Sequence, residues 1–153
     1  MLLPNTAATQ AFGARLALAL QELDQGLTIA LAGELGAGKT TLARATITAL
    51  GHDGPVVSPT YTLLESYPVA GRNLHHLDLY RLSDPQELEF IGLRELAAQT
   101  DWFMIEWPER GAGHLPALDV TIELAYVRGA RSVAAHAESS RGSAFACMLQ
   151  LER

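Results

Sequence analysis

Cysteine is nearly absent from the sequence: Cys147 is the only one, so no internal disulfide can form. The chain also has no Cys-x-x-Cys pair and no cluster of cysteines and histidines spaced like metal ligands. A lone cysteine is typical of a chain in a reducing compartment. We therefore expect Cys147 to be a small, buried apolar side chain.

Positive charge is scarce as well. Lysine and arginine together number 11 against 17 aspartates and glutamates, which gives a net charge of −6 at pH 7. The sequence has no basic run or arginine-rich arm, so we do not expect it to bind DNA or RNA by itself through phosphate neutralisation. An acidic surface is better suited to protein partners and to a nucleotide with Mg²⁺.

Long apolar runs are missing too. No stretch approaches the ~20 residues needed to span a bilayer, and the N-terminus lacks the basic and apolar segments of a secretion signal. We therefore expect a cytoplasmic protein without membrane contact. With 153 residues, 48% of them hydrophobic and 18% charged, the composition predicts one globular domain over residues 1–153.

The sequence does contain a glycine-rich motif at residues 33–41, Gly-Glu-Leu-Gly-Ala-Gly-Lys-Thr-Thr. Residues 33–40 fit the phosphate-binding pattern G-x-x-x-x-G-K-[S/T]. The apolar segment 27–32 before it predicts a buried strand, and segment 42–50 after it predicts a helix that Gly51 ends. Strand, glycine-rich turn and helix follow in the order that the motif requires, so we predict a nucleotide-binding site.

The chemistry of a phosphate site explains these residue types. Glycines let the backbone wrap around an anion, and the start of a helix adds unpaired amide groups. We predict that Lys39 contacts the β- and γ-phosphates, that the Thr40 hydroxyl binds Mg²⁺, and that Thr41 lies near the α-phosphate. Lys39 is also the only lysine in the chain. The residues of the motif that we expect at the nucleotide are Glu34, Leu35, Gly36, Ala37, Gly38, Lys39, Thr40 and Thr41.

The first two-thirds of the chain alternates expected helices and strands. Apolar residues between 12 and 23 recur at helical spacing after a capping Asn5 or Thr6. Segments 74–80 and 102–107 are typical of buried strands, and residues 68–72 of a turn. Residues 84–87, Asp-Pro-Gln-Glu, have the capping sequence of a helix, which we expect to break near Gly92 before segment 93–99.

Beyond residue 116 the pattern changes. Apolar and polar residues alternate at 120–126 and again at 145–151, while 128–131 and 139–142 are typical of turns between antiparallel strands. The sequence therefore predicts an α/β fold: a three-layer P-loop NTPase fold with a mixed, mainly parallel sheet and antiparallel strands added at its C-terminal end. In such sheets the ligand lies beyond the carboxyl ends of the strands.

Two acidic residues lie in the apolar strands expected beside the loop, Asp78 and Glu106. A carboxylate in such a strand is costly unless it is paired or bound to a metal. Because a phosphate loop needs an acid near its Mg²⁺, we predict metal-linked, catalytic roles for both. Either could hold Mg²⁺ through water, and Glu106 could also orient the attacking water. The alternative is an ion pair with Arg81 or Arg110.

For some other side chains, the sequence is compatible with either a role in the site or a structural role. Thr60 could sense the γ-phosphate as threonines of switch loops do, or be a turn hydroxyl. Trp107 could stack on the base or on a partner, or be a core aromatic. His75 and His76 have no matching metal ligands elsewhere, so we expect them to be strand or surface histidines.

Four blocks of the sequence together resemble one family. They are residues 33–41, 58–63 (Ser-Pro-Thr-Tyr-Thr-Leu), 76–82 (His-Leu-Asp-Leu-Tyr-Arg-Leu) and 105–109 (Ile-Glu-Trp-Pro-Glu). In order and spacing they look like the TsaE family, also called YjeE, over about residues 6–125. A glycine loop alone is common, whereas the four blocks together are specific. Past Tyr126 the chain departs from the family pattern, which leaves the last strands and any arginine there unassigned.

The resemblance implies a function. TsaE proteins are small P-loop ATPases of bacterial tRNA threonylcarbamoyladenosine modification that bind the TsaB–TsaD pair. That pair modifies the adenosine next to the anticodon, and TsaE supports its repeated turnover through ATP. For this chain the resemblance thus implies ATP and Mg²⁺ as cofactors, TsaD and TsaB as partners, and contact with tRNA only through the complex.

The resemblance also assigns residues by motif position. It implies that Lys39 and Thr40 bind phosphate and Mg²⁺, and that Asp78 and Glu106 are active-site acids. It places Trp107 near the nucleotide and residues 58–62 in a switch-like loop.

The main alternative is a small-molecule kinase built on the same loop. Such kinases carry a substrate domain and an arginine-bearing lid, and this chain has little length for either. A guanine-nucleotide switch is disfavoured because no Asn-Lys-x-Asp motif occurs. A nucleotide-gated interaction module with slow hydrolysis overlaps with the TsaE interpretation.

Overall fold

A computed structural model describes residues 1–96 and 98–151 of the chain. Its helices and strands are, in order, β1 (Leu2–Leu3), α1 (Thr6–Gln21), β2 (Leu27–Ala32), α2 (Lys39–Ala49), β3 (Leu64–Val69), β4 (Arg72–Asp78), α3 (Glu87–Phe90), β5 (Trp102–Glu106), β6 (Val120–Val127), β7 (Ala130–Ala137) and α4 (Ser140–Met148). Two short 3₁₀ helices are η1 (Leu93–Glu95) and η2 (Pro108–Gly111). In the described part of the chain, no helix has the length and apolar character needed to cross a bilayer.

The described strands form one sheet of seven, in the order β1-β7-β6-β2-β5-β4-β3. The four central strands are parallel, because β2 pairs in parallel with both β5 and β6, and β5 with β4. The predicted mixed α/β fold is therefore confirmed. Antiparallel pairing occurs at both edges of the sheet, since β3 pairs with β4 at one edge and β7 with β6 and β1 at the other.

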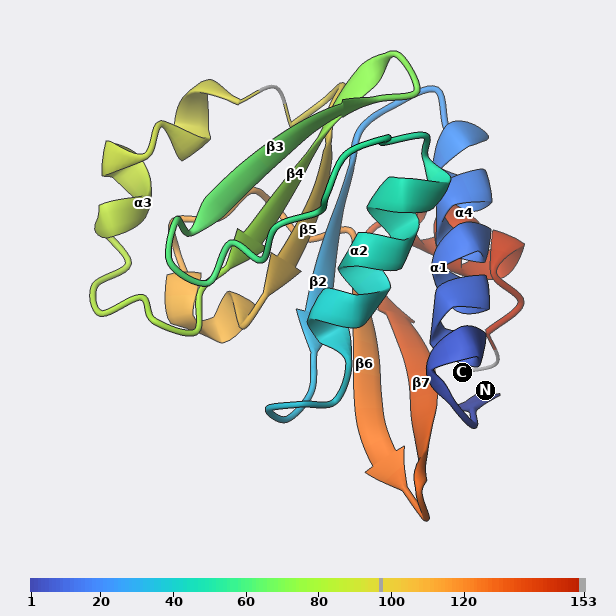
Figure 1. Ribbon diagram of the computed structural model, residues 1–153. Coiled ribbons are helices and arrows are strands. Elements are labelled where there is room, and N and C mark those ends of the chain that lie inside the picture. Colours follow the sequence, from blue (N-terminus) through green and yellow to red (C-terminus); the bar gives the residue numbers. More distant parts are fainter. Residues whose placement is uncertain (97, 152–153) are drawn as a thin grey trace.

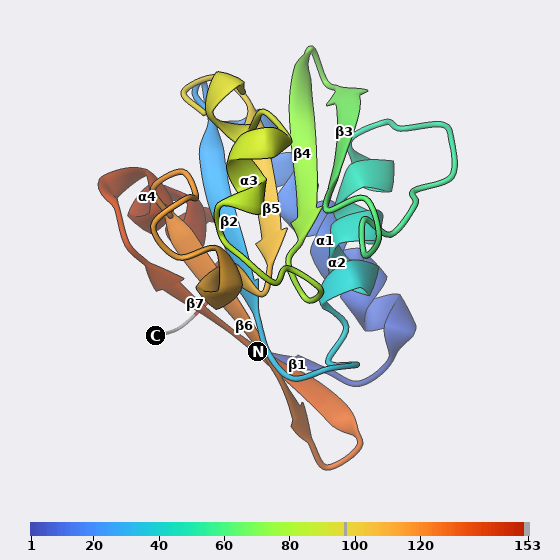
Figure 2. The ribbon, with the colours of Figure 1, turned by 90° about the vertical axis from the view of Figure 1, so that its left-hand side faces the viewer.

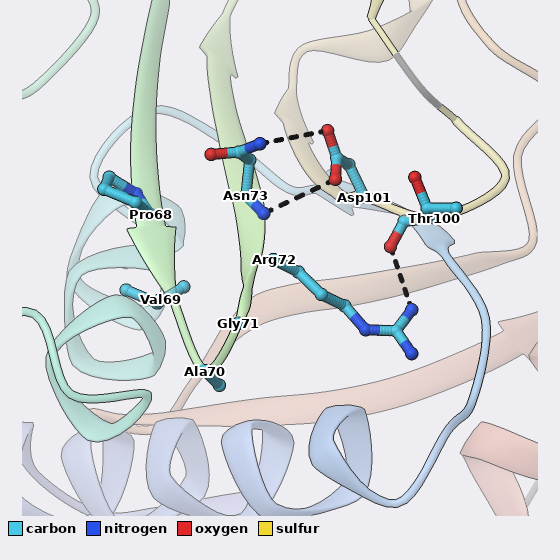
Figure 3. Close-up of a pocket in the computed structure, with 8 residues that line it drawn as sticks. All are labelled: Pro68, Val69, Ala70, Gly71, Arg72, Asn73, Thr100 and Asp101. Carbon is cyan, nitrogen blue, oxygen red and sulfur yellow. Dashed lines mark hydrogen bonds between the residues drawn. The ribbon is translucent and has the colours of Figure 1, made fainter.

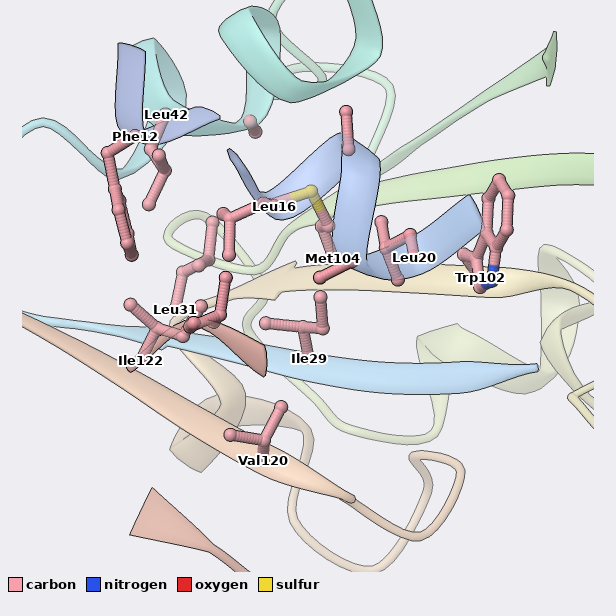
Figure 4. Packing of buried hydrophobic residues seen from close by; sticks show 14 of the residues in the cluster. Phe12, Leu16, Leu20, Ile29, Leu31, Leu42, Trp102, Met104, Val120 and Ile122 are labelled. Atoms are coloured by element: carbon pink, nitrogen blue, oxygen red, sulfur yellow. The ribbon is translucent and has the colours of Figure 1, made fainter. Parts of the chain in front are cut away.

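Three layers result from the alternation of side chains along the strands. Helices α1 and α2 lie side by side over one face, with α4 beside α1 (Figures 1 and 2). Their apolar side chains pack onto that face in the larger core cluster, part of which Figure 4 shows. Phe103 and Ile105 point to the opposite face, where Leu88 of α3 and Leu93 of η1 cover them.

The N-terminal half follows the predicted elements closely. The Asn5 side chain caps α1 by accepting a hydrogen bond from the amide of Ala8, 2.9 Å away. Strand β2 has the predicted bounds, and α2 ends just before Gly51, whose φ is +102°. At Gly13 an added Cβ would lie 2.5 Å from the Cβ of Ala45, so this glycine allows α1 and α2 to approach closely.

The middle of the chain differs from the prediction in detail. The expected turn at 68–72 is narrower, because Pro68 lies inside β3, opposite Asn73. Proline is tolerated there because β3 is an edge strand, which leaves one side of its backbone without a partner strand. The contact expected of the capping sequence at 84–87 forms, because Glu87 Oε1 accepts from the amide of Asp84 at 3.0 Å. The helix itself begins later than predicted, at Glu87 with Gln86 as its N-cap instead of at Pro85 with Asp84 as its N-cap, and it is only four residues long. The expected segment 93–99 includes residue 97, which lies outside the described residues.

The predicted strand at 145–151 is wrong. These residues belong mainly to helix α4, which Ser139 caps by accepting from the amide of Gly142 at 3.0 Å. The alternating apolar pattern misled because Phe145 and Leu149, the two residues buried deepest, are four positions apart and so also share one face of a helix. Cys147, expected to be buried, lies on the outer face of α4 and is exposed.

Candidate functional site

The site lies at the carboxyl edge of the parallel strands. Residues 33–38, here called the glycine loop, follow β2, while Asp78 ends β4 and Glu106 ends β5. The strand register pairs Asp78 with Glu106, and Glu106 with Leu31 at the end of β2. Sheet topology alone thus brings together residues from three distant parts of the sequence.

These elements surround a pocket of about 350 Å³. The pocket is lined by Leu35, Gly36, Gly38, Lys39, Thr40, Thr41, Thr60, Asp78, Tyr80, Arg81, Glu106 and Trp107. Of the site residues predicted from the sequence, all line this pocket except Glu34 and Ala37, which lie in the glycine loop but do not line the pocket. A second pocket of about 460 Å³, shown in Figure 3, lies at the opposite edge of the sheet beside the β3–β4 turn and contains none of them.

The glycine loop has a backbone that other residues adopt only with strain. Gly33 and Gly38 have φ values of +140° and +107°. A Cβ on Gly33 would lie 2.2 Å from the carbonyl oxygen of Leu124, so the loop passes directly against β6. Helix α2 begins at Lys39, and the first amide groups of a helix have no acceptor within it. Together with the helix dipole, these amides make the loop suited to an anion.

Lys39 is held inside the loop. It is 4% exposed, and its Nζ donates to the carbonyl oxygens of Gly33 at 2.6 Å and Glu34 at 2.9 Å. The same nitrogen lies 4.2 Å from the centre of the Trp107 ring, within the range of a cation–π interaction. Burial lowers the pKa of Lys39 below its usual 10.5, and the negative charge of Glu106 opposes this shift.

Glu106 is bound at both of its carboxylate oxygens. The Thr40 hydroxyl donates to Oε2 at 3.0 Å, and Nε2 of His76 lies 2.8 Å from Oε1. Glu106 is 2% exposed and His76 is fully buried. A buried carboxylate is stable only when it has such partners.

Asp78 has a separate set of partners. Its Oδ2 accepts from the hydroxyl of Thr60 at 2.9 Å, and its Oδ1 accepts from the amide of Tyr80 at 3.0 Å. The Ser58 hydroxyl lies 2.7 Å from that of Thr60, so the loop before β3 is connected to the acid at the end of β4. Among the described residues, neither Asp78 nor Glu106 forms the ion pair with Arg81 or Arg110 that was the alternative explanation for them.

Trp107 has a strained backbone. Its φ is +57°, and positive φ in a residue as bulky as tryptophan is rare and concentrated at functional sites. Its ring lies 5.1 Å from that of Tyr80, and the Arg110 guanidinium lies 5.8 Å from its centre. The sequence left three roles open for Trp107; the structure places it at the pocket, beside Lys39.

Sequence reasoning missed three residues of the site. His76 precedes Asp78 by two positions in β4, so strand alternation places both on the face that α2 covers; that spacing was the available signal. His75 points to the opposite face, where Nε2 lies 3.0 Å from Asp101. The other two come from β6 and β7: the Tyr126 hydroxyl donates to the carbonyl of Gly36, and Arg131 Nε donates to that of Ala37 at 3.0 Å.

The donor set favours one kind of metal. In the described part of the chain no group of three or more His, Cys, Asp or Glu side chains could hold an ion. The pocket instead offers the hydroxyl of Thr40 and the carboxylates of Asp78 and Glu106. Mg²⁺ prefers such oxygen ligands, and it is commonly bound by one or two carboxylates with phosphate oxygens and waters. The residues therefore fit Mg²⁺ bound together with a phosphate ligand.

The fold and the pocket define an α/β protein with a lysine-bearing glycine loop and two acids at the carboxyl edge of its sheet. Among solved structures, one titled "Crystal structure of Bacillus subtilus YdiB" has the same fold, with a TM-score of 0.69. The comparison covers 95% of this chain and 88% of that one, at 24% sequence identity.

Sequence comparison identifies the family. Residues 3–133 match the family model described as "Threonylcarbamoyl adenosine biosynthesis protein TsaE". The chain is 42% identical over 142 residues to the tRNA threonylcarbamoyladenosine biosynthesis protein TsaE of Haemophilus influenzae, covering 92% of this chain and 90% of the relative. It is 40% identical over 112 residues to the Synechocystis protein of that name, covering 71% and 69%. This chain belongs to the TsaE family.

Proposed function

We propose that this chain is a Mg²⁺-dependent ATPase that supports the TsaB–TsaD pair in threonylcarbamoyl modification of the adenosine next to the anticodon of tRNA. In this proposal residues 1–153 act as a single ATPase domain. Contact with tRNA is indirect, through the complex. Family membership supports the pathway, and the geometry of the pocket supports the chemistry.

One observation carries the ATPase proposal. Lys39, Thr40, Asp78 and Glu106 converge on a single pocket although they come from three elements of the fold. A compact cation, a helix N-terminus, a hydroxyl and two carboxylates are the groups needed to bind a nucleoside triphosphate with Mg²⁺.

Each residue then has a distinct task. The amides of the glycine loop bind the phosphates, and Lys39 exchanges its bonds with two loop carbonyls for bonds with phosphate oxygens. The Thr40 hydroxyl donates a hydrogen bond to Glu106. The lone pairs of the Thr40 oxygen therefore remain free to face a cation. Asp78 has its oxygens oriented by Thr60 and the backbone of Tyr80, and Trp107 borders the phosphates beside Lys39.

Mg²⁺, when bound, neutralises the charge of the β- and γ-phosphates. Thr40 would hold it directly, with Asp78 and Glu106 as the acids beside it. Glu106 is the acid better placed to orient a water, because it is the one hydrogen-bonded to Thr40 at the start of α2.

The test is ATP turnover by the purified chain with Mg²⁺, alone and with TsaB, TsaD and tRNA. We expect the partners to stimulate turnover, and we expect Lys39→Ala to abolish it. Two matched variants sharpen the test: Thr40→Val removes a predicted metal ligand, whereas Thr48→Val changes an exposed threonine two turns further along α2. Only the first should lose turnover.

Turnover that is indifferent to the partners would leave a nucleotide site but contradict the proposed role. A phosphate-accepting metabolite that stimulates turnover in place of the partners would instead favour a small-molecule kinase.

A further inference from the structure

His76 occupies a position where an apolar side chain would be expected. It lies in the middle of β4, its ring is fully buried, and its neighbours in the sheet include the buried Met104. Within residues 1–96 and 98–151, only one of its ring nitrogens has a hydrogen-bond partner: Nε2 lies 2.8 Å from Oε1 of Glu106. The other, Nδ1, is buried with no hydrogen-bond partner among the described residues.

An unpaired buried nitrogen is destabilising compared with an apolar side chain of similar size. Stability alone therefore does not explain a histidine at this position. What the histidine supplies is the hydrogen bond of its other nitrogen. An ionised carboxylate can only accept hydrogen bonds, so Nε2 of His76 is the N–H group that donates the hydrogen bond to Glu106.

This bond removes the rotational freedom of the Glu106 carboxylate. The terminal torsion of a glutamate is broad, and a carboxylate held at one oxygen by Thr40 alone could turn about its bond. With Oε1 fixed by His76, Oε2 is directed to the Thr40 hydroxyl. Thr40 belongs to the first turn of α2 and His76 to β4, so the two bonds fix Glu106 between helix and sheet.

We propose that His76 is a positioning residue for Glu106, and through it for Thr40, in the reaction of the pocket. This inference rests on the proposed ATPase function and deepens it. His76 does not reach the pocket itself and is not among the residues that line it. Its contribution is to keep the acid in the orientation that hydrolysis needs, so losing it should lower kcat more than it weakens nucleotide binding.

Two substitutions separate this role from a purely structural one. His76→Met fills the space with an apolar side chain and removes the donor. His76→Gln keeps an N–H group at a distance along the side chain close to that of Nε2. The matched control is His75→Met, which changes the adjacent histidine on the opposite face of the sheet, where its partners are Ser66 and Asp101.

The measurements are kcat and KM for Mg-ATP with the stimulating partners present, and thermal unfolding of the chain. For His76→Met we expect kcat to fall about 10- to 100-fold, the usual range when a residue that orients a ligand is removed. KM should change less than about threefold, and the unfolding temperature should not fall. His76→Gln should recover most of kcat, and His75→Met should leave it unchanged.

A third measurement is independent of turnover. ¹H–¹⁵N spectra of the imidazole groups should show an Nε2 proton of His76 that is protected from exchange, and Glu106→Gln should shift it. If that proton is absent, the hydrogen bond and the proposal are both rejected.

The outcomes distinguish the positioning role of His76 from the proposed ATPase function. Normal kcat in His76→Met rejects the positioning role alone and leaves the ATPase proposal standing. A joint fall in kcat, nucleotide affinity and unfolding temperature without recovery in His76→Gln also rejects it, in favour of a structural role. Absence of turnover in the unmodified protein with its partners rejects the proposed function and this role with it.

Discussion

The Thr40 hydroxyl donates a hydrogen bond to Oε2 of Glu106 across 3.0 Å, although the two residues are 66 positions apart in the chain. The bond joins the first turn of α2 to the end of β5. It orients the threonine so that its oxygen faces the pocket, and it gives a buried carboxylate one of its two partners. In the proposed function, this pair links cation binding to hydrolysis.

The first prediction concerns Glu106→Gln, which keeps the size of the side chain and removes its charge. We expect Mg-ATP affinity to stay within a few-fold and hydrolysis to fall by about 10²-fold or more, as for the loss of a group that orients or activates water. Equilibrium binding and single-turnover hydrolysis would measure the two effects. The control is Glu95→Gln, an exposed glutamate of η1 that does not line the pocket, which should change neither. Normal hydrolysis by Glu106→Gln would show that its assignment is wrong.

The second prediction concerns the hydrogen bond between β7 and the glycine loop. Arg131 donates from Nε to the carbonyl of Ala37 at 3.0 Å. Its replacement by alanine should weaken nucleotide binding about two- to tenfold, the equivalent of one hydrogen bond of about 0.5–1.5 kcal/mol. Titration with an ATP analogue would measure the change. Arg128→Ala, in the exposed turn of the same hairpin, should have no effect; equal losses in both variants would indicate a general charge effect.

The third prediction compares two glycines with positive φ. Gly33→Ala meets the carbonyl oxygen of Leu124 at 2.2 Å, whereas a Cβ on Gly113, whose φ is +83°, meets nothing within 4 Å. Both variants carry the cost of left-handed backbone, about 1–2 kcal/mol. Gly33→Ala should lower the free energy of unfolding by at least about 2 kcal/mol more than Gly113→Ala, because β6 must move away. Denaturant unfolding would measure both, and equal losses would contradict the close approach of loop and strand.

The fourth prediction uses the two tryptophans. Trp107 lies beside Lys39 at the pocket, whereas Trp102 is buried in the core. In a Trp102→Phe background, Mg-ATP should change the emission of Trp107, because the Lys39 ammonium moves from the indole ring toward phosphate. The change should saturate with the binding curve and vanish in Lys39→Ala. Saturable binding without any change in emission would mean that Lys39 stays where it is.

Local patterns predicted the parts of this molecule that are locally determined. The segment 27–32 is one mainly apolar run between Gly26 and Gly33, and it forms β2 with those bounds. The pocket was predictable because a glycine-rich turn follows one parallel strand and single acids end two others, and strand topology places all three at one edge.

The missed features depend on packing that a sequence pattern does not contain. Strand β1 has two residues, too few for any periodicity, and exists only because β7 offers it an edge. The pattern at 145–151 suited a strand and a helix equally. Arg131 reaches the glycine loop only because β6 and β7 form a hairpin against it, and neither its spacing nor its neighbours indicate that contact.

Lys39 is the only lysine of the chain, and the structure encloses it in the proposed active site. The ε-amine of this residue is therefore the single side-chain amine of the sequence with which an amine-directed reagent can react. A covalent label on the ε-amine is thus a label of the pocket itself, obtained without mutagenesis. The rate at which it forms would report how often the loop releases the lysine, and protection by a bound ligand would report occupancy.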